Sequence, residues 1–571
     1  MSAIGKLSFH RKIIRTFPTF KYHIRGHRVS IPQNFTDYES IKQYNPQIPE
    51  NFNFAKDVLD VWAEQEKRGQ RADGPALWWV NDRKEEVRWS FDELGFHSRR
   101  LANVLSGVCS LNQQDRVFLV LPKVPEWWLV NVACLRTGTV LLPGTYQLTA
   151  RDILHRLQTS RARCVITDES LAPVLDSVAS QCSSLQHKLL VSPTKRDGWM
   201  NFGDLLRNAS SDHECVNTRS DDPMTIFFTS GTTGSPKMTQ HSHSSYGIGL
   251  TVNGRYWLDL TERDVLWNTS DTGWAKSAWS SVFAPWTQGA CVFIHHMPRF
   301  NSHTVLETLS NYPITTFCTA PTAYRMLVQE DLSKYHFNTL QHCLSAGEPI
   351  NPDVMRKWKD ATGLDIYEGY GQTETVSSLK LFGEFGTFVV TLQVVDEAGN
   401  VLPRGVEGNI GIRVKPHKPF CLFTEYTDDL VRTAECYVGD FYLTGDRGRM
   451  DQDGYLWFEG RADDVILSAG YRIGPFEVEN ALIEHQAVAE SAVVSSPDPI
   501  RGEVVKAFVV LTPEYKSQDQ DQLVKKLQTH VKEVTAPYKY PRKIEFVEQL
   551  PKTISGKIRR VELRNKEWGR S

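Results

Sequence analysis

The sequence has little of several features that would define other classes of protein. No uninterrupted apolar run in its 571 residues is long enough to cross a bilayer, so we expect no transmembrane segment and a water-soluble body. The formal net charge is only −2, which gives no electrostatic argument for nucleic acid as a partner. The ten cysteines never form a Cys-x-x-Cys pair, which favours reduced thiols over disulfides or a zinc site. A chain of this length exceeds one hydrophobic core, so we expect two or more domains.

Acidic residues are absent from the first part of the chain. Between Met1 and Thr36, basic residues such as Lys6 and Arg15 are interleaved with apolar ones such as Ile4 and Phe17. A basic, amphipathic, acid-free start is typical of a mitochondrial transit peptide. We therefore predict such a peptide at residues 1–28 and a location in the mitochondrial matrix. A disordered basic arm or a membrane-surface segment are the alternatives.

Beyond about Asn51, short β-rich runs alternate with helical patterns. This alternation implies βαβ units and a largely parallel sheet, and hence an α/β fold. Strands are predicted at Val117–Leu121, Thr139–Leu142, Cys164–Thr167 and Lys188–Val191, an amphipathic helix at Pro125–Arg136, and further helices at Ala150–Ser160 and Leu171–Ala179.

The composition shifts near Gly460, where we place a domain boundary between residues 29–460 and 461–571. Beyond it, Ala489–Val494 and Val504–Leu511 are predicted as paired strands, and Ile544–Val547 as a final strand. A helix is predicted between the second and the final strand, because apolar residues recur there at 3.6-residue spacing. Its apolar face carries Leu523, Leu527, Val531 and Val534. The second unit is thus a small α/β domain.

The strongest local signal is the Ser/Thr/Gly-rich segment Thr229–Lys237, which follows the predicted strand end Ile226–Phe228. Its glycines let backbone N–H groups approach phosphate oxygens, and its hydroxyls and Lys237 add donors and charge. It is not a Walker A loop, because Ser235 and Pro236 intervene before the lysine and Met238 follows it. A flexible surface loop is the alternative.

This segment resembles the signature of the acyl-adenylate-forming enzymes, and the resemblance recurs in order along almost the whole chain. The further matching motifs are Ser345–Pro349, Tyr367–Glu374, Tyr442–Asp446, Gly460–Asp464 and Pro551–Lys557. Finer resemblance, to the medium-chain acyl-CoA synthetases of mitochondria, is carried by Asp271–Lys276, by Pro143–Thr145 followed by Gln147, and by Ala469–Glu477.

The resemblance implies a large multi-sheet N-terminal adenylation domain and a small, mobile C-terminal lid domain. It also implies ATP-dependent ligation of a medium-chain fatty, or related aromatic, carboxylic acid to CoA. The reaction would pass through an acyl-adenylate and give acyl-CoA, AMP and pyrophosphate. The expected partners are ATP, CoA and the acid, with Mg²⁺ accompanying ATP, and we expect a monomer or a weak homo-oligomer.

Adenylation concentrates negative charge on phosphate oxygens, so the site must supply cations and hydrogen-bond donors. We predict that Lys557 bridges the acid and the α-phosphate, and that Glu374 holds magnesium with Thr229 or Thr373 nearby. Asp446 is expected to accept from two ribose hydroxyls. Arg461 has two open roles, a ribose or phosphate contact or a structural salt bridge. The expected ATP-binding residues are Thr229, Ser230, Gly231, Thr232, Thr233, Gly234, Ser235, Pro236, Lys237, Gly347, Glu348, Pro349, Glu368, Gly369, Tyr370, Gly371, Gln372, Thr373, Asp446, Arg461 and Lys557.

Thiol transfer requires that one pocket first exclude water and then admit CoA, which a hinged lid achieves. By resemblance, Asp463 is the pivot. The expected CoA-binding residues are Gln147, Ala469, Gly470, Tyr471, Arg472, Arg501, Lys532, Tyr540 and Arg542.

The acid-binding site is less well defined by the sequence. Trp274 and Thr373 are the candidates, and Trp279 could line the same channel or belong to the core. His241 and His243 lack further ligands for a metal, so we expect them to be packed or hydrogen-bonded.

Segment 377–393 departs from the family pattern directly after Glu374. Relatives carry a longer Gly/Pro-rich connection here, which leaves three classes open. They are a functional medium-chain ligase, a different adenylating enzyme such as an aromatic-acid ligase, and a catalytically impaired isoform that binds nucleotide or acyl groups.

Overall fold

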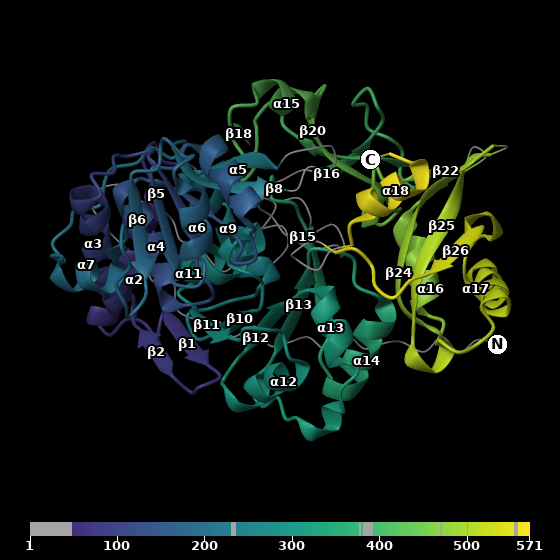
Figure 1. Ribbon diagram of the computed structural model, residues 1–571, viewed down its shortest axis with the longest axis horizontal. Coiled ribbons are helices and arrows are strands. Elements are labelled where there is room, and N and C mark those ends of the chain that lie inside the picture. The colour runs from purple at the N-terminus through teal and green to yellow at the C-terminus, as the bar shows by residue number, and fades with distance from the viewer. Residues whose placement is uncertain are drawn as a thin grey trace, which may run out of the picture.

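The computed structural model describes residues 48–229, 236–375, 379–380, 392–468, 471–499, 501–552 and 558–570, with backbone only for Leu379, Lys380 and Arg472. Figure 1 shows a large body of three sheets, coloured purple to green, and a smaller yellow unit to one side of it. The predicted α/β class is confirmed.

One eight-stranded sheet carries the phosphate-loop segment. Its order is β18-β9-β8-β4-β3-β5-β6-β7, parallel from β8 to β7 and antiparallel at β8-β9 and β9-β18. Its strands are β3 (Arg116–Val120), β4 (Val140–Pro143), β5 (Cys164–Asp168), β6 (His187–Val191), β7 (Met200–Asn201), β8 (Pro223–Thr229), β9 (Lys237–Ser242) and β18 (Glu425–Tyr426).

A second eight-stranded sheet carries the predicted adenine-side motifs. Its order is β15-β14-β13-β12-β10-β11-β1-β2, parallel except at the two edge strands β15 and β2. Its strands are β1 (Leu77–Asn81), β2 (Glu86–Trp89), β10 (Val265–Asn268), β11 (Cys291–His296), β12 (Thr316–Thr319), β13 (His342–Ala346), β14 (Ile366–Tyr370) and β15 (Leu379–Lys380).

Two smaller sheets follow. The first is antiparallel, with the order β16-β17-β20-β19 and β21 paired to β20. The second, β23-β22-β25-β24 with β26 parallel to β25, forms the yellow unit. Their strands are β16 (Leu392–Val395), β17 (Glu407–Arg413), β19 (Tyr437–Val438), β20 (Phe441–Met450), β21 (Leu456–Arg461), β22 (Ile466–Ser468), β23 (Tyr471–Ile473), β24 (Val488–Asp498), β25 (Gly502–Leu511) and β26 (Lys543–Phe546).

Helices connect the strands and cover the sheets (Figure 1). The α-helices are α2 (Asp60–Lys67), α3 (Phe91–Asn103), α4 (Pro125–Thr137), α5 (Ala150–Ser160), α6 (Ala172–Ala179), α7 (Phe202–Asn208), α8 (His243–Gly247), α9 (Leu250–Val252), α10 (Ala275–Ala278), α11 (Ala284–Thr287), α12 (Ser302–Asn311), α13 (Pro321–Leu327), α14 (Pro352–Thr362), α15 (Leu430–Glu435), α16 (Pro475–Ile483), α17 (Gln520–Val534) and α18 (Arg560–Trp568). Short π- and 3₁₀-helical segments are η1 (Ala55–Leu59), η2 (Val104–Val108), η3 (Asn253–Trp257), η4 (Trp279–Phe283), η5 (Leu332–Lys334), η7 (Pro513–Tyr515) and η8 (Pro537–Lys539).

Helix α4 corrects one sequence prediction. Pro125 stands at its N-terminus, and Gly138 ends it with φ of 66°, a conformation that favours glycine. The helix was expected to be amphipathic, but every residue except Glu126 is buried, and Trp128 Nε1 donates to Ser281 O at 2.7 Å. A helix enclosed on all sides has no solvent face, so its sequence loses the polar stripe of a surface helix.

The C-terminal unit follows its prediction with one exception. Strands β24 and β25 pair antiparallel, and Leu523, Leu527 and Val531 of α17 are buried in its core. Val534 lies on the same face by its spacing, but it is 46% exposed and stays outside the buried core. It is the last residue of α17.

The chain passes from one sheet to the other between Arg461, the last residue of β21, and Ile466, the first of β22. The predicted pivot Asp463 lies within this connection. No helix in the described ranges combines the length and apolarity needed to span a membrane.

Candidate functional site

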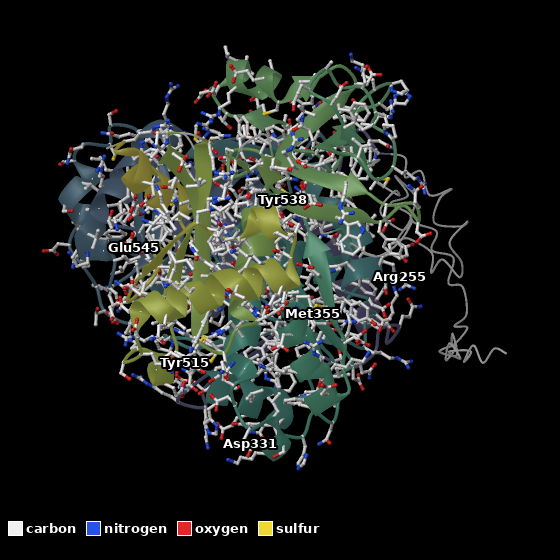
Figure 2. All side chains as sticks on the ribbon, turned by 90° about the vertical axis from the view of Figure 1, so that its right-hand side faces the viewer. Arg255, Asp331, Met355, Tyr515, Tyr538 and Glu545 are labelled. Carbon is white, nitrogen blue, oxygen red and sulfur yellow. The ribbon has the colours of Figure 1, made fainter. Side chains whose placement is uncertain are left out.

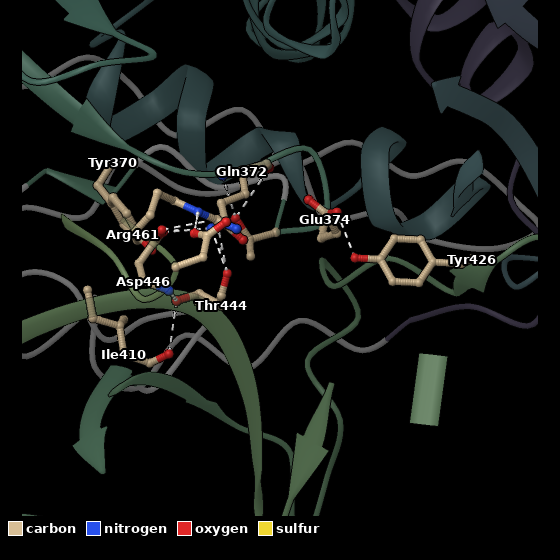
Figure 3. Close-up of polar contacts among 10 residues, drawn as sticks. Tyr370, Gln372, Glu374, Ile410, Tyr426, Thr444, Asp446 and Arg461 are labelled. Carbon is tan, nitrogen blue, oxygen red and sulfur yellow. Dashed lines mark hydrogen bonds and ion pairs between the residues drawn. The ribbon is translucent and has the colours of Figure 1, made fainter. Parts of the chain in front are cut away.

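A buried polar network surrounds Asp446 on β20 (Figure 3). Tyr370 Oη and Gln372 Nε2 donate to Asp446 Oδ2 at 2.5 and 2.6 Å, and Arg461 Nη1 donates to Oδ1 at 3.1 Å. Gln372 Nε2 also bonds Thr444 O at 2.9 Å. The pairing of β20 with β21 places Arg461 directly opposite Asp446. Three predicted nucleotide motifs therefore meet at one carboxylate.

The electrostatics of this network follow from its burial. Asp446 is 3% exposed, and burial raises the pKa of its carboxyl against the opposing effects of Arg461, Tyr370 and Gln372. Burial acts to lower the pKa of Arg461, but Asp446 and Asp463 outweigh it and raise that pKa. Of the two roles left open for Arg461, the salt bridge is present in this structure, and a ribose or phosphate contact stays a prediction.

Glu374 lies beside this network, and the chain fixes it at several points. Tyr426 Oη donates to Glu374 Oε1 at 2.8 Å (Figure 3). Phe423 N donates to Glu374 O at 2.8 Å. His241 Nε2 is 2.7 Å from the neighbouring Thr373 O. Because a carbonyl can only accept, Nε2 must carry the ring proton. These contacts hold the carboxylate in place before any ligand binds.

The two histidines behave as the sequence predicted. Both side chains are buried, and burial lowers the pKa of each to about 3, so both rings are neutral. Ser245 Oγ lies 3.1 Å from His241 Nδ1, which completes the hydrogen bonding of that ring. A packed or hydrogen-bonded role is confirmed for His241.

The described ends of the phosphate-loop segment lie next to Glu374. Thr229 and Lys237 are paired residues of β8 and β9, and β9 pairs in turn with β18, which carries Tyr426. Lys237 Nζ lies 4.7 Å from the centre of the Tyr426 ring. Burial lowers the pKa of Lys237. Ser230, Gly231, Thr232, Thr233, Gly234 and Ser235 lie outside the described residues.

The adenine-side motifs meet at the carboxyl ends of β13 and β14, where Ala346 pairs with Gly369. Lys276 Nζ donates to Ala346 O at 2.9 Å and to Thr319 O at 3.1 Å. Gly347 has φ of 112°, which favours glycine at this turn. Glu348 Oε1 accepts from Arg325 Nη2 at 3.3 Å.

Glu368, on β14, is a further partly buried carboxyl of this region. Burial raises its pKa to about 7, while a bond donated by Ile350 N at 3.0 Å opposes that shift. The side chain is therefore partly protonated near neutral pH.

The residues around Glu374 match the ligand preference of magnesium. The described residues hold no cluster of three or more His, Cys, Asp or Glu side chains that would make an all-protein metal cage. Magnesium instead favours one or two carboxylates together with phosphates and water. Glu374, oriented by Tyr426 beside Thr229 and Lys237, fits that donor set.

Several predicted CoA-binding residues gather on the C-terminal unit. Lys532 Nζ lies 4.0 Å from the centre of the Tyr540 ring, and Arg542 Cζ lies 4.9 Å from it. Arg542 Nη1 also donates to Tyr540 Oη at 2.9 Å. Tyr471 stacks on Tyr538, with ring centres 4.4 Å apart. Figure 2 labels Tyr538 on this unit.

Other predicted CoA-binding residues are placed separately. Gln147 is exposed and belongs to the N-terminal body. Arg501 is exposed next to Gly502, which pairs with Ser468 of β22. Ala469 and Gly470 lie outside the described residues, as does the side chain of Arg472.

Lys557 also lies outside the described residues. Lys552 and Ile558, which flank its motif, form an antiparallel β-bridge. Arg560 follows two residues later and is buried against Glu479. Burial acts to lower the pKa of Arg560, but Glu479, Asp464 and also Glu348 of the N-terminal body raise it. Glu348 is therefore close enough to act on the charge of Arg560.

The two tryptophans proposed for the acid site differ. Trp274 is half-buried at the start of α10, whereas Trp279 is buried and its Nε1 donates to Tyr246 Oη at 3.0 Å. A small apolar cavity lies beside this region. It is lined by Asn131, Cys134, Leu135, Leu141, Met224, Thr225, Phe227, Ala278 and Phe283.

Sequence reasoning did not select Tyr426 or Tyr538. Tyr426 is separated from Glu374 by 52 residues, and no motif marks it. Tyr538 is close in sequence to Tyr540 and Arg542, which were predicted to bind CoA. An aromatic residue beside these predicted residues was the signal that could have selected it.

Comparison with known proteins agrees with the order of these motifs. The family model described as AMP-binding enzyme matches residues 64–418, and that of the AMP-binding enzyme C-terminal domain matches residues 477–557. The predicted boundary at 460/461 falls between the two matches and stays a prediction.

The chain is also similar to curated relatives over nearly its whole length. It is 64% identical to the mitochondrial acyl-coenzyme A synthetase ACSM3 of Homo sapiens over 554 residues, covering 95% of this chain and 94% of the relative. It is 58% identical to the mitochondrial acyl-coenzyme A synthetase ACSM4 of Rattus norvegicus, covering 97% of each.

Solved structures show the same arrangement of a large N-terminal and a small C-terminal domain. An anthranilate CoA ligase, AuaEII, crystallised with anthranoyl-AMP, superposes with a TM-score of 0.82 at 28% identity, over 91% of this chain and 98% of that one. A benzoate CoA ligase from Burkholderia xenovorans LB400 superposes with a TM-score of 0.77 at 26% identity, over 90% and 100%. The chain therefore belongs to the AMP-binding enzyme family and, within it, to the acyl-coenzyme A synthetases.

Proposed function

We propose that the chain ligates a medium-chain fatty, or related aromatic, carboxylic acid to CoA through an acyl-adenylate, releasing AMP and pyrophosphate. The observation that carries this proposal is the convergence of Glu374, Lys237 and the Asp446 network from separate sheets, with Glu374 just beyond the carboxyl end of β14. Ligands of α/β folds bind at such strand ends. The structural relative that holds anthranoyl-AMP, an acyl-adenylate, supports the same intermediate.

In the first half-reaction, a carboxylate oxygen of the acid attacks the α-phosphorus of ATP. The bond from that phosphorus to the bridging oxygen of the β-phosphate breaks, and pyrophosphate leaves. Magnesium on Glu374 would neutralise phosphate charge, and Tyr426 would keep Glu374 oriented toward it. Lys237 and the phosphate-loop residues would bind phosphate oxygens, and Lys557 would bridge the acid and the α-phosphate.

The Asp446 network narrows the expected contact with ribose. Oδ2 already accepts from Tyr370 and Gln372, whereas Oδ1 accepts only from Arg461 among the described contacts. Each carboxylate oxygen offers about two lone-pair sites. We therefore propose that Oδ1 accepts one ribose hydroxyl. From the sequence, the Asp446 carboxylate was instead expected to accept from two ribose hydroxyls.

The apolar cavity beside α10 and β8 has a lining that suits an acyl chain, but it has room for only about one water-sized molecule and would have to widen to accept one. Its lining residues Phe227 and Thr225 lie on β8, whose carboxyl end is Thr229, and Ala278 lies on α10, which begins after Trp274. An acid held with its carboxylate near Thr229 and Thr373 could direct its tail toward this cavity.

In the second half-reaction, the CoA thiolate attacks the acyl carbonyl, the carbonyl–oxygen bond to AMP breaks, and AMP leaves. Lys532, Tyr540 and Arg542 would bind CoA phosphates together with Arg472 and Arg501, and Tyr471 with residues 469–470 would line the pantetheine path. These residues act on the acyl-adenylate only after rotation about Asp463, which makes Asp463 the proposed pivot.

We place the protein in the mitochondrial matrix, with residues 1–28 as its transit peptide. The names of the relatives, each a mitochondrial acyl-coenzyme A synthetase, and the basic leader support this location. A monomer or weak homo-oligomer stays a prediction. No observation favours the impaired-isoform alternative, and most of segment 377–393 lies outside the described residues.

The decisive experiment measures the two half-reactions separately. Pyrophosphate release should depend on the acid across a panel of medium-chain and aromatic acids, and acyl-CoA should appear only when CoA is added. Lys557→Ala should lose adenylate formation by about 100-fold or more, because it removes charge at the attacked phosphate. It should keep thioester formation from preformed adenylate.

Lys552→Ala is the matched control, since this lysine is the second residue of the same motif but is paired with Glu490 at 2.7 Å. Acid-independent pyrophosphate release by the wild type would refute the proposed function. Equal loss of both half-reactions in Lys557→Ala would refute the role of that lysine.

A further inference from the structure

Two arginines hold Asp463 from opposite sides of the connection between the sheets. Arg461 Nε donates to Asp463 Oδ1 at 3.4 Å, and the same guanidinium is bonded to Asp446 of β20. The Asp463 side chain is thereby tied to the N-terminal body.

The second arginine is Arg564, on the last helix. Its Nη1 donates to Asp463 O at 2.6 Å and to Asp464 Oδ1 at 2.7 Å, and its side chain is only 18% exposed. Helix α18 is itself fastened to the C-terminal sheet. Trp568 Nε1 donates to Ser495 Oγ at 3.1 Å, and the neighbouring Glu567 Oε2 accepts from Ser496 Oγ at 2.8 Å.

One backbone bond, the Cα–C bond of Asp463, lies between these two attachments. Its Cα carries the side chain held by Arg461, and its carbonyl carbon carries the oxygen held by Arg564. Rotation about this bond moves the carbonyl oxygen, Asp464 and Arg564 together, so the bonds of Arg564 persist. The bonds from Asp464 N and Val465 N to Arg461 O, at 3.1 and 3.2 Å, cross the rotating bond and must break.

We propose that Arg564 is a positioning residue that ties the downstream side of the hinge to the C-terminal unit and confines the domain rotation to the Cα–C bond of Asp463. This proposal rests on the proposed function, because a two-step ligation is what calls for the rotation. Without Arg564, bending could spread along residues 462–465, and the C-terminal face would reach the acyl group less accurately.

Asp464 supports the assignment. Its carboxylate is 14% exposed, and burial raises its pKa against the opposing charges of Arg560 and Arg564. Arg560 is already engaged by Glu479 through two hydrogen bonds, at 2.9 and 2.6 Å. Arg564 is therefore the donor that hydrogen-bonds Asp464 in the described structure, and its loss would leave a buried carboxylate without that bond.

The test compares Arg564→Met, Arg564→Lys and the control Lys566→Met. Lys566 lies on the same helix, but its ion pair is with Glu545 at 3.0 Å, away from the hinge. Hydrogen–deuterium exchange is measured for peptides covering residues 458–468 and for peptides from β24. In Arg564→Met, exchange at the hinge should be about tenfold faster, because charge-assisted hydrogen bonds are lost, while β24 stays protected.

Both half-reactions should slow by a similar factor in Arg564→Met, because the attachment moves with the C-terminal unit in either orientation. Arg564→Lys should restore part of the rate, and Lys566→Met should match the wild type. Unchanged hinge exchange in Arg564→Met would overturn the proposal. Faster exchange in β24 as well would show a general structural role, and loss of one half-reaction alone would show a latch for a single orientation.

Should Arg564→Met fail to fold, Asp464→Asn weakens one of the two contacts and carries the same comparison. A wild-type protein without acid-dependent pyrophosphate release would refute the proposed function. The exchange data would still decide whether Arg564 holds the hinge, so the two failures are distinguishable.

Discussion

The Asp446 network and the cluster around Tyr540 both combine charged and aromatic side chains, but they lie in opposite environments. Asp446 is 3% exposed and accepts from three side chains, each fixed by its own strand or loop. Lys532 and Arg542 instead lie against the Tyr540 ring at the surface of the C-terminal unit, near the stacked pair of Tyr471 and Tyr538, which are 53% and 40% exposed.

The difference follows from the chemistry assigned to each place. Buried charges interact strongly and cannot relax in water, so a network of this kind is preorganised for a transition state. Exposed cations are screened by salt and each contributes little, but they can adapt to a long ligand that must arrive and leave. We therefore expect substitutions in the first region to have larger effects than those in the second, and effects that depend less on salt.

The largest effect is expected for Asp446→Asn. A small effect of this substitution would contradict the expected difference between the buried network and the exposed cluster. The substitution leaves Arg461 without its buried partner and removes the acceptor proposed for ribose. We expect kcat/KM for ATP to fall by about 100-fold and the free energy of unfolding by about 2 kcal/mol. Steady-state pyrophosphate release and urea unfolding measure these changes.

Asp440→Asn is the control for Asp446→Asn. Asp440 lies just before the same strand, but it is exposed and its salt bridges with Arg413 and Lys415 are 3.9 and 3.5 Å long. Equal losses in the two variants would show that burial does not set the importance of Asp446.

Glu368→Gln tests whether burial also perturbs a carboxyl near the Asp446 network, through the pH dependence of stability. Because burial raises the pKa of Glu368 from 4.5 to about 7, the folded state binds this proton more tightly than the unfolded state. Wild-type stability should therefore decline as pH rises from about 4.5 to about 7 and then level off. The glutamine variant should gain at most about 3 kcal/mol of stability relative to wild type across that window.

Urea unfolding at several pH values measures the effect of Glu368→Gln, and Glu484→Gln, at an exposed position, is the control. A constant difference between Glu368→Gln and wild type from pH 4.5 to 8 would contradict the raised pKa.

Tyr426→Phe tests whether orientation of Glu374 matters. The change removes the hydroxyl that donates to Glu374 Oε1 at 2.8 Å and keeps the ring beneath Lys237. One hydrogen bond to a carboxylate corresponds to about tenfold, so we expect that loss in the rate of adenylation, partly relieved by higher magnesium concentration.

Tyr437→Phe is the matched control for Tyr426→Phe, because the buried Tyr437 hydroxyl has no hydrogen-bond partner among the described residues. If the Tyr426→Phe enzyme had the magnesium dependence of the wild type, Tyr426 would have no role in magnesium binding.

The smallest effect is expected at the C-terminal surface. Arg542→Ala should raise KM for CoA about three- to fivefold at low salt and less at high salt, as expected for an exposed charge. Acid-dependent pyrophosphate release should stay unchanged. Lys525→Ala, at an exposed position of the same unit, is the control. An effect of Arg542→Ala on adenylation would mean that the cluster acts in both steps.

Much of the fold could be predicted because its signals are local. Helix α5 spans the predicted residues Ala150–Ser160, and β24 pairs with β25 as expected. Thr149 caps α5 through Asp152, a signal contained in four consecutive residues. The prediction failed where environment overrides pattern, as in α4, which is buried except for Glu126.

The candidate site divides in the same way. Asp446, Glu374 and Lys237 could be selected from the sequence because each belongs to a short motif whose residue types suit phosphate, ribose or magnesium. Tyr426 could not be selected, since it is 52 residues from its partner Glu374. The same holds for Arg564, which is 101 residues from the predicted pivot Asp463.

The sequence by itself determined the order of the motifs, the α/β character, the family and the chemistry that the motif residues can perform. These properties depend on residue type and on spacing over a few positions, which the chain carries before it folds. Only the tertiary structure decided that Asp446 shares its oxygens with Tyr370, Gln372 and Arg461, and that the two sides of Asp463 are held by different units. Such contacts join distant segments, and they exist because sheet register and helix packing bring those segments within hydrogen-bonding distance.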